Sequence, residues 1–372
     1  MKKILVVLGT RPEAIKLAPV ILQLKNNKNY KVIVCNTEQQ KELSNQTLGF
    51  FGLKADINLD VMIPNQTLSQ LQSNLLHKLE EIFMYDQFDA TLVQGDTMTV
   101  FCAALASFYN RTPVFHVEAG LRSHNLFEPF PEEAIRQMVS RITSLHFCPT
   151  ISSKASLEKE CLVHKNFIET GNTVIDALSC IDDSVLKTAI SRIESYNIDL
   201  NKPIVLITVH RRENHGERLE DIINAISEIS ATFKNIQFVI PVHPNPNVKN
   251  RIYSRLNSIS NVYLLSPLPY PELVVLMKNS LMIMTDSGGI QEEAPTFGCP
   301  ILVLRYETER QEGIHAGFAK LVGSETEVIV KAAKDVIENM SLYKSLKQKP
   351  NPYGDGFAAK RIINYIDKFF YN

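Results

Sequence analysis

Carboxylates and cations follow three apolar runs in the first half of the chain, at the points where those runs end. Glu13 follows the first run, Asp96 follows a later one, and Glu118 follows the next along the chain. Arg11 and Lys16 flank Glu13. The carboxyl ends of strands in an open α/β sheet are where ligands bind, so the convergence of three such turns favours a ligand site at this edge. Each residue also has a structural alternative: Asp96 as a helix cap, Glu118 as a surface turn residue, and Arg11 as a local partner of Glu13.

A segment rich in Pro and Phe, RSHNLFEPFPEE at 122–133, lies shortly after Glu118. Glu132 and Glu133 then open a helix that runs through Met138. Acidic residues in a first helical turn are ordinary. The Pro and aromatic content favours, as the alternative, a fixed loop that holds a carboxylate in a cleft.

The segment 281–304 predicts a buried strand, a tight turn, a short helix and a second buried strand. Ser287 would supply an N-cap oxygen, and Gly288 and Gly289 leave the backbone bare at the helix start. Unpaired N–H groups there favour a phosphate, although an ordinary strand–helix turn remains the alternative. Glu293, one turn further on, would accept hydrogen bonds from ribose hydroxyls. Pro295 removes one backbone donor, so we expect this helix to be short or kinked.

Several cations lie at the expected strand ends of the second half, either as a salt-bridged rim or as a clamp for a diphosphate. They are Arg211, Arg212, Arg305 and Arg310. His210 and His243 fit no zinc-binding spacing, so we expect no metal.

Strand–helix alternation along the whole chain predicts doubly wound parallel sheets. The clearest strands are expected at 4–8, 31–35, 90–93, 114–117, 203–208, 237–242, 262–265 and 281–284. We therefore expect an α/β protein with two Rossmann-like domains facing a central cleft. The first would span 1–170, with helix 357–372 packing back on it, and the second would span 171–356. Ligands of such sheets bind at the carboxyl ends of the strands. No G-x-G-x-x-G follows the first strand, so a dinucleotide cofactor gains no support.

The composition of the 372 residues is that of an ordinary globular protein, with 45% hydrophobic and 21% charged residues. A formal net charge of -1 implies no nucleic-acid partner. The six cysteines include no CxxC pair, and those at 35, 102, 148 and 299 lie in apolar patterns typical of buried thiols. No apolar run approaches about 18 residues, the length of a membrane span. We therefore expect a soluble, cytoplasmic protein.

A set of long motifs, in order along the whole chain, resembles the non-hydrolysing UDP-N-acetylglucosamine 2-epimerases. These motifs are GTRPEAIKLAP (9–19), GDT (95–97), HVEAGLRS (116–123), PFPEEA (129–134), GNTVIDAL (171–178), HRREN (210–214), PVHPNPNV (241–248), TDSGGIQEEAP (285–295), TER (308–310) and NPYGDG (351–356). The resemblance implies a fold like the GT-B glycosyltransferases and interconversion of UDP-N-acetylglucosamine and UDP-N-acetylmannosamine. It also implies a homodimer without metal or nicotinamide, serving bacterial surface polysaccharide synthesis.

The resemblance also assigns roles by position. It implies elimination of UDP to 2-acetamidoglucal and readdition, with proton transfer at either face of C2. The residues that match the family's catalytic groups are Asp96, Glu118, Glu132 and His210. The residues that match positions holding the UDP-sugar are Arg11, Lys16, His210, Ser287, Gly288, Gly289, Glu293 and Arg310.

Several positions depart from the family pattern. Gln94 stands where His is usual, Ile135 where Asn is usual, and Gln311 where Pro is usual, while Leu273 replaces a common aromatic residue. The segment 39–42, QQKE, stands where many bacterial members carry QHRE for a second, activating substrate molecule. The alternatives are a hydrolysing 2-epimerase, an epimerase of a modified UDP-N-acetylhexosamine, a GT-B glycosyltransferase, or a non-catalytic nucleotide-sugar sensor.

Overall fold

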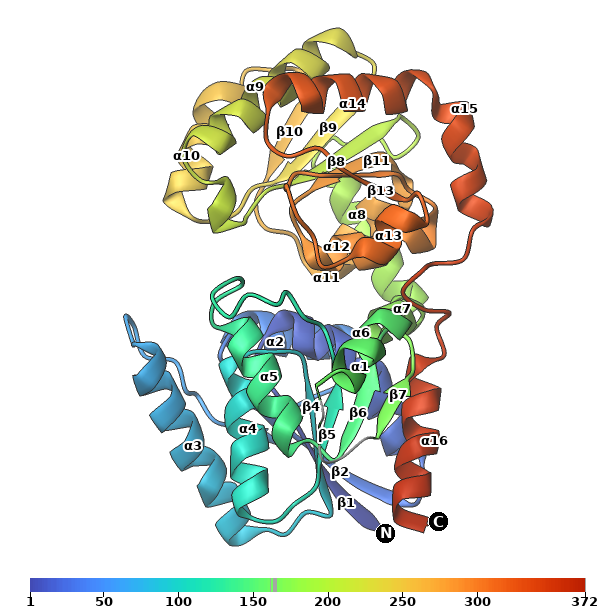
Figure 1. Cartoon of the computed structure of the whole chain (residues 1–372). Coiled ribbons are helices and arrows are strands. Elements are labelled where there is room, and N and C mark those ends of the chain that lie inside the picture. Colours follow the sequence, from blue (N-terminus) through green and yellow to red (C-terminus); the bar gives the residue numbers. More distant parts are fainter. Residues whose placement is uncertain (161, 163–165, 372) are drawn as a thin grey trace. The chain divides into compact units, whose positions relative to one another are not determined.

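The computed structural model describes residues 1–160, 162 and 166–371. It divides into two compact units: an N-terminal unit of Met1–Cys180 with Tyr353–Asn372, and a C-terminal unit of Ile181–Pro352. Each unit holds a parallel sheet whose strands alternate with helices along the chain (Figure 1). The predicted fold class, two doubly wound Rossmann-like domains of the GT-B-like kind, is confirmed.

The N-terminal unit is built on a seven-stranded sheet in the order β3-β2-β1-β4-β5-β6-β7, all of whose described pairs are parallel. Residues 4–8 of β1 are fully buried, which explains their continuous apolar run. The strands are β1 (Lys2–Leu8), β2 (Tyr30–Asn36), β3 (Ile57–Asn58), β4 (Ala90–Gln94), β5 (Val114–Val117), β6 (Leu145–Cys148) and β7 (Phe167–Glu169). The helices are α1 (Arg11–Asn26), α2 (Lys41–Phe50), α3 (Leu68–Tyr85), α4 (Met98–Tyr109), α5 (Glu132–Ile142), α6 (Ile151–Glu158), α7 (Thr173–Ser179) and α16 (Ala358–Tyr371).

The C-terminal unit is built on a six-stranded parallel sheet in the order β10-β9-β8-β11-β12-β13. Its strands are β8 (Ile204–Thr208), β9 (Gln237–Pro241), β10 (Val262–Leu265), β11 (Ser280–Thr285), β12 (Ile301–Val303) and β13 (Ala319–Leu321). Its α-helices are α8 (Asp183–Ser195), α9 (Glu217–Thr232), α10 (Pro246–Leu256), α11 (Tyr270–Asn279), α12 (Gly288–Glu293), α13 (Gln311–His315), α14 (Thr326–Glu338) and α15 (Met340–Tyr343). Its 3₁₀ helices are η1 (Arg212–Asn214), η2 (Ala294–Phe297) and η3 (Lys344–Gln348).

The boundary between the units lies after Cys180, not after residue 170 as expected, because α7 packs against α1 and α16. Asp176 of α7 accepts the backbone N–H groups of Ala358 (3.2 Å) and Ala359 (2.8 Å) at the start of α16. These bonds satisfy two of the donors that a helix N-terminus leaves open. The chain therefore returns to the N-terminal unit at Tyr353, slightly before the expected residue 357.

The described cysteines carry no disulfide, and Cys35, Cys102, Cys148 and Cys299 are buried. Burial raises the pKa of the Cys35 thiol to about 12, so it stays protonated at neutral pH. Cys161 lies outside the described residues. No helix of the described chain is long and apolar enough to cross a membrane.

The turn between β1 and α1 is organised by the buried carboxylate of Glu13. Its Oε2 accepts the N–H groups of Gly9 (2.6 Å) and Thr10 (2.9 Å), and the Thr10 hydroxyl accepts the Glu13 N–H, which completes a capping box. Its Oε1 accepts the hydroxyl of Thr97 from the turn between β4 and α4. Burial raises the pKa of Glu13 to about 7, against the opposing effect of these hydrogen bonds. Glu13 therefore ties together two of the turns that carry candidate site residues.

We predict that Glu13→Gln flattens the pH dependence of the free energy of unfolding. The Glu13 carboxyl keeps its proton up to about pH 7 when folded but only up to about 4.5 when unfolded. The unfolded state therefore binds fewer protons between these values, and wild-type stability falls as pH rises through the interval, by roughly 3 kcal/mol at most. Glutamine does not titrate, so the variant escapes this loss. Urea denaturation followed by circular dichroism at several pH values measures the difference.

Glu80→Gln is the matched control, because Glu80 is exposed on α3. Its unfolding free energy should fall with pH as the wild type does. A Glu13→Gln variant that shows the same fall would contradict the account.

Candidate active site

The candidate residues of the N-terminal unit follow β4 and β5, which are neighbours in the sheet. Gln94 of β4 lies opposite Val117 of β5 in the sheet. Asp96 follows Gln94 by two residues, and Glu118 follows Val117 directly. Both carboxylates thus lie at the carboxyl ends of adjacent parallel strands, the edge where ligands of doubly wound sheets bind.

Glu118 is held from two sides. Lys16 of α1 donates to its Oε1 at 2.7 Å, and the side-chain amide of Gln94 donates to its Oε2. The side chains of Lys16 and Glu118 are only 9% and 7% exposed, so this is a buried ion pair. Glu118 has φ +66°, a left-handed conformation that is uncommon outside glycine. The alternative interpretation of Glu118 as a surface turn residue is therefore wrong. Lys16, which was expected to bind the UDP-sugar, forms an ion pair with Glu118 in the structure.

Asp96 accepts a hydrogen bond from Arg136 Nε of α5 at 2.8 Å, and Arg136 Nη2 forms an ion pair with it at 2.6 Å. Both go to Oδ2. The N-cap of α4 is Thr97, whose hydroxyl accepts the Val100 N–H, so the helix-cap alternative for Asp96 is wrong. The sequence analysis missed Arg136. Its position three residues after an acidic residue on a predicted helix was the available signal.

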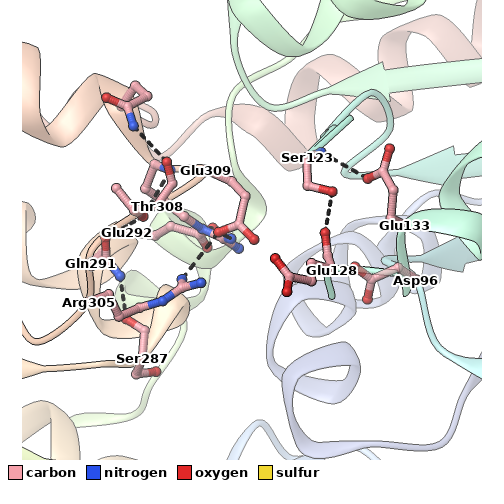
Figure 2. Close-up of polar contacts among 12 residues, drawn as sticks. Asp96, Ser123, Glu128, Glu133, Ser287, Gln291, Glu292, Arg305, Thr308 and Glu309 are labelled. Carbon is pink, nitrogen blue, oxygen red and sulfur yellow. Dashed lines mark hydrogen bonds and ion pairs between the residues drawn. The ribbon is translucent and has the colours of Figure 1, made fainter. Parts of the chain in front are cut away.

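The segment 122–133 is fastened to the start of α5. Glu133 is fully buried and accepts the Ser123 N–H at 2.9 Å, and the Ser123 hydroxyl donates to the Glu128 carbonyl (Figure 2). This connection supports the interpretation of a fixed loop. Arg122, which precedes Ser123, pairs instead with Glu160 at 2.5 Å.

Glu132 occupies the first position of α5. Its Oε2 is buried and accepts no hydrogen bond from the described chain. A buried carboxylate oxygen without a partner carries an uncompensated desolvation cost, which a ligand donor can remove. Glu132 Oε2 is therefore open to a hydrogen bond from a ligand donor.

Arg11 is the first residue of α1, and its backbone N–H donates to the Gln40 side chain at 3.1 Å. Gln40 is the N-cap of α2 and belongs to the segment 39–42. Lys41 of the same segment pairs with Glu38 at 3.3 Å and with Asp60 at 3.0 Å. The structure thus joins the Arg11 turn to the segment that departs from the family pattern.

In the C-terminal unit the central group is Asp286, which sequence reasoning did not single out. It is fully buried and accepts His210 Nδ1 at 2.8 Å, the Arg211 N–H at 2.9 Å and the Asn214 amide at 3.0 Å. Burial alone raises the pKa of Asp286, but the hydrogen bonds from His210 and from the backbone outweigh it and leave the pKa lowered.

The Asp286 carboxylate keeps a proton on His210 Nδ1. The other ring nitrogen, Nε2, does not contact Asp286, and the His210 side chain is 39% exposed. The His243 ring lies 6.2 Å from the His210 ring, centroid to centroid, and its pKa is lowered by burial and by the His210 charge. The described residues contain no group of three or more His, Cys, Asp or Glu side chains that would hold a metal ion.

The turn at 287–289 lies at the start of α12. Ser287 is the N-cap residue of α12, but its hydroxyl accepts no hydrogen bond from the helix. The prediction that this hydroxyl caps the helix is therefore wrong. Instead the Ser287 N–H donates to Thr285 Oγ1 at 2.9 Å. A Cβ on Gly288 would lie 2.9 Å from Arg310 Cζ, so only glycine allows this approach of the guanidinium to the helix start. The expected interruption by Pro295 is confirmed, since η2 replaces the α-helix from Ala294.

Three arginines gather around the exit of β8 and β12. Arg305 pairs with Glu213 at 2.6 Å and with Glu309 at 3.3 Å, and Arg310 pairs with Glu309 at 3.2 Å. Burial and the charges of Arg305 and Arg310 lower the pKa of Arg211, whose buried Nε has no partner in the described structure. The side chain of Arg212 lies outside the described residues.

The acidic residues of α12 support this arginine group. Glu292 accepts Arg310 Nε at 3.0 Å, while Gln291 bridges the Ser287 carbonyl and the Thr308 hydroxyl (Figure 2). Glu293, expected to bind ribose, is buried with an exposure of 5%. Arg305 and Arg310 are thus salt-bridged, as the rim alternative predicts, but their side chains are only 10% and 11% exposed rather than solvated.

Comparisons with known proteins agree on one family. Residues 22–367 match the family model described as UDP-N-acetylglucosamine 2-epimerase. The UDP-N-acetylglucosamine 2-epimerase of Neisseria meningitidis is 45% identical over 98% of this chain and 99% of its own length. That of Campylobacter jejuni is 42% identical over 99% of this chain and 98% of its own.

Solved structures give the same result. The crystal structure of the UDP-GlcNAc 2-epimerase from Neisseria meningitidis bound to UDP-GlcNAc has a TM-score of 0.91 at 45% identity and covers 98% of this chain and 100% of that one. The Methanocaldococcus jannaschii UDP-GlcNAc 2-epimerase in complex with UDP-GlcNAc and UDP has a TM-score of 0.81 at 31% identity, covering 98% and 99%. With matches of this identity over nearly its whole length, the chain belongs to the UDP-N-acetylglucosamine 2-epimerase family.

Proposed function

We propose that this protein catalyses the reversible C2 epimerisation of UDP-N-acetylglucosamine to UDP-N-acetylmannosamine without hydrolysing it. The observation that carries the proposal is the pair of carboxylates Asp96 and Glu118, on adjacent strand ends, each held by a cation of its own. Family membership and the relatives that bind UDP-GlcNAc or UDP support the substrate.

The chemistry requires two steps because the C2 proton of the sugar is not acidic. The anomeric C1–O bond breaks first, and its electron pair leaves with UDP. The positive character that develops at C1 acidifies C2–H, whose proton passes to a carboxylate as the C1=C2 bond of 2-acetamidoglucal forms. UDP then adds back to C1 while a proton is delivered to the opposite face of C2. Asp96, Glu118 and Glu132 are the proton-transfer groups that we propose.

The C-terminal unit would bind the UDP. Arg211, Arg305 and Arg310 would stabilise the charge that builds on the departing diphosphate. When protonated on both ring nitrogens, His210 would donate Nε2–H to it, with the ring oriented by Asp286 through Nδ1. The turn 287–289 would contribute backbone N–H groups, and Glu293 would bind the ribose. Arg11 and Lys16 of the N-terminal unit complete the proposed set for the UDP-sugar.

We further propose that the reaction needs neither metal nor nicotinamide, and that the protein is a cytoplasmic homodimer supplying bacterial surface polysaccharide synthesis. A hydrolysing 2-epimerase is the second candidate, favoured by the departures at Gln94 and Gln311 from the family pattern. The two differ in one product: hydrolysis gives free N-acetylmannosamine and UDP.

The deciding experiment is proton NMR of the purified protein with UDP-N-acetylglucosamine in deuterium oxide, without additives. We expect UDP-N-acetylmannosamine that carries deuterium at C2, because the transferred proton comes from a carboxylate that exchanges with solvent. Free N-acetylmannosamine as the main product would replace the proposal with the hydrolysing one. No conversion would remove the proposal for this sugar and direct the same test to modified UDP-N-acetylhexosamines.

Asp96→Asn, Glu118→Gln and Glu132→Gln should each lower kcat by about 100-fold or more, since an amide cannot transfer the proton. The affinity for UDP, measured by calorimetry, should change by less than about threefold because its proposed site lies mainly in the C-terminal unit. Glu80→Gln serves as the exposed control. A kcat near the wild-type value in any of the three would exclude that carboxylate from proton transfer.

Asp286→Asn should lower kcat by about 10- to 100-fold, because the amide cannot hold the His210 ring and its proton as the carboxylate does. His210→Asn should cause a comparable or larger loss. The double variant should be no worse than His210→Asn alone, since both changes remove one hydrogen-bonded unit. A normal kcat for His210→Asn beside an impaired Asp286→Asn would show that Asp286 acts on the backbone only.

A further inference from the structure

Arg136 lies outside the residues assigned above, yet it contacts one of them directly. We propose that Arg136, clamped by Glu133, is a positioning residue that holds one oxygen of Asp96 and leaves the other for proton transfer. The inference rests on the proposed function, because it concerns the role given there to Asp96.

The geometry distinguishes the two oxygens of Asp96. Arg136 donates Nε–H to Oδ2 at 2.8 Å, and its Nη2 lies 2.6 Å from the same oxygen in an ion pair. Oδ1 accepts no hydrogen bond from the described chain, although the Asp96 side chain is 26% exposed. A carboxylate held in this way cannot rotate to exchange its oxygens without losing a charge-assisted hydrogen bond and an ion-pair contact. Oδ1 is therefore the oxygen presented to a substrate.

The guanidinium is itself fixed at its far side. Arg136 Nη1 donates to Glu133 Oε2 at 3.3 Å, and Glu133 is fully buried. The Ser123 N–H (2.9 Å) and the Gln137 side chain (2.9 Å) also donate to Glu133. Only a planar guanidinium reaches both carboxylates at once, and a lysine ammonium has no such fork.

Glu133 also gives Arg136 a second carboxylate partner besides Asp96. When Asp96 takes a proton, its negative charge disappears, and a buried Arg136 without a partner would be costly. Glu133 remains as the counter-ion, so the guanidinium keeps its position. The side chain of Arg136 is 8% exposed, which makes this compensation necessary.

The backbone around Asp96 has supports that do not involve Arg136. His116 Nε2 lies 2.7 Å from the Gly95 carbonyl and donates to it, and the Thr97 hydroxyl is bound to Glu13. Removal of Arg136 should therefore release the Asp96 carboxylate while the turn keeps its conformation. This separates positioning of the side chain from a general effect on the fold.

The test compares Arg136→Lys and Arg136→Gln with the wild type. We expect kcat to fall by about 10-fold in the lysine variant, which keeps the charge, and by about 100-fold in the glutamine variant, with KM and the affinity for UDP within about threefold. In the Asp96→Asn background, Arg136→Gln should cause no further loss, because Arg136 acts through Asp96. A purely structural role predicts an additional loss in that background.

The matched control is Arg122→Gln, which removes another buried arginine of the same unit from its pair with Glu160. It should lower the melting temperature as Arg136→Gln does, with a smaller effect on kcat. A folded Arg136→Gln variant with kcat within about threefold of the wild type overturns the inference, as does an additive double variant. If Arg136→Gln does not fold, a wild-type kcat in Arg136→Lys overturns it. A wild-type protein inactive on UDP-N-acetylglucosamine overturns the proposed function itself.

Discussion

The candidate site depends on one constraint: a carboxylate taken out of water needs compensating donors. In the N-terminal unit the donors are side chains, since Glu118 lies between Lys16 and Gln94, and Asp96 lies on Arg136. In the C-terminal unit backbone donors take part as well, since Asp286 accepts the N–H groups of His210 and Arg211 besides His210 Nδ1 and the Asn214 amide. Such pairs add little stability compared with apolar packing of the same volume, but loss of one partner is costly. We interpret their presence here as a means of fixing orientation.

The two sources of donors suit two tasks. The backbone donors to Asp286 belong to the segment that follows β8, so they cannot move unless that segment moves. Asp286 in turn holds the His210 ring, which is therefore fixed relative to the sheet. Side-chain donors on Glu118 and Asp96 can shift without moving the backbone of the sheet. Glu132 has a buried oxygen that no described group satisfies, so it belongs to neither pattern. The cost of removing this oxygen from water is already part of the folded protein. A substrate that donates a hydrogen bond to it would therefore not add that cost on binding.

Much of this arrangement was predictable from the sequence, and the exceptions have a common cause. Continuous apolar runs predicted the strands, and polar residues after them located Asp96 and Glu118, because strand ends in parallel sheets meet at one edge. Pro295 correctly limited α12. Asp286 was missed because its partners His210 and Asn214 are distant in sequence, and Arg136 because its partner Asp96 is. Ser287 was given a capping role that its local sequence favours, but its hydroxyl makes no capping bond in the structure. Local pattern identifies which residues stand at an edge, whereas pairing between them is set by tertiary contact.

The unequal surroundings of Asp96 and Glu118 bear on how one protein could serve two faces of a carbon atom. Glu118 has donors on both oxygens, so any proton it accepts must displace a bond from Lys16 or Gln94. Asp96 has both donors on Oδ2, so Oδ1 can take a proton while the Arg136 contacts persist. Asp96 and Glu118 therefore differ in which oxygen is open to a new partner. Under the proposed mechanism, this difference in geometry would let one carboxylate accept a proton while another delivers one.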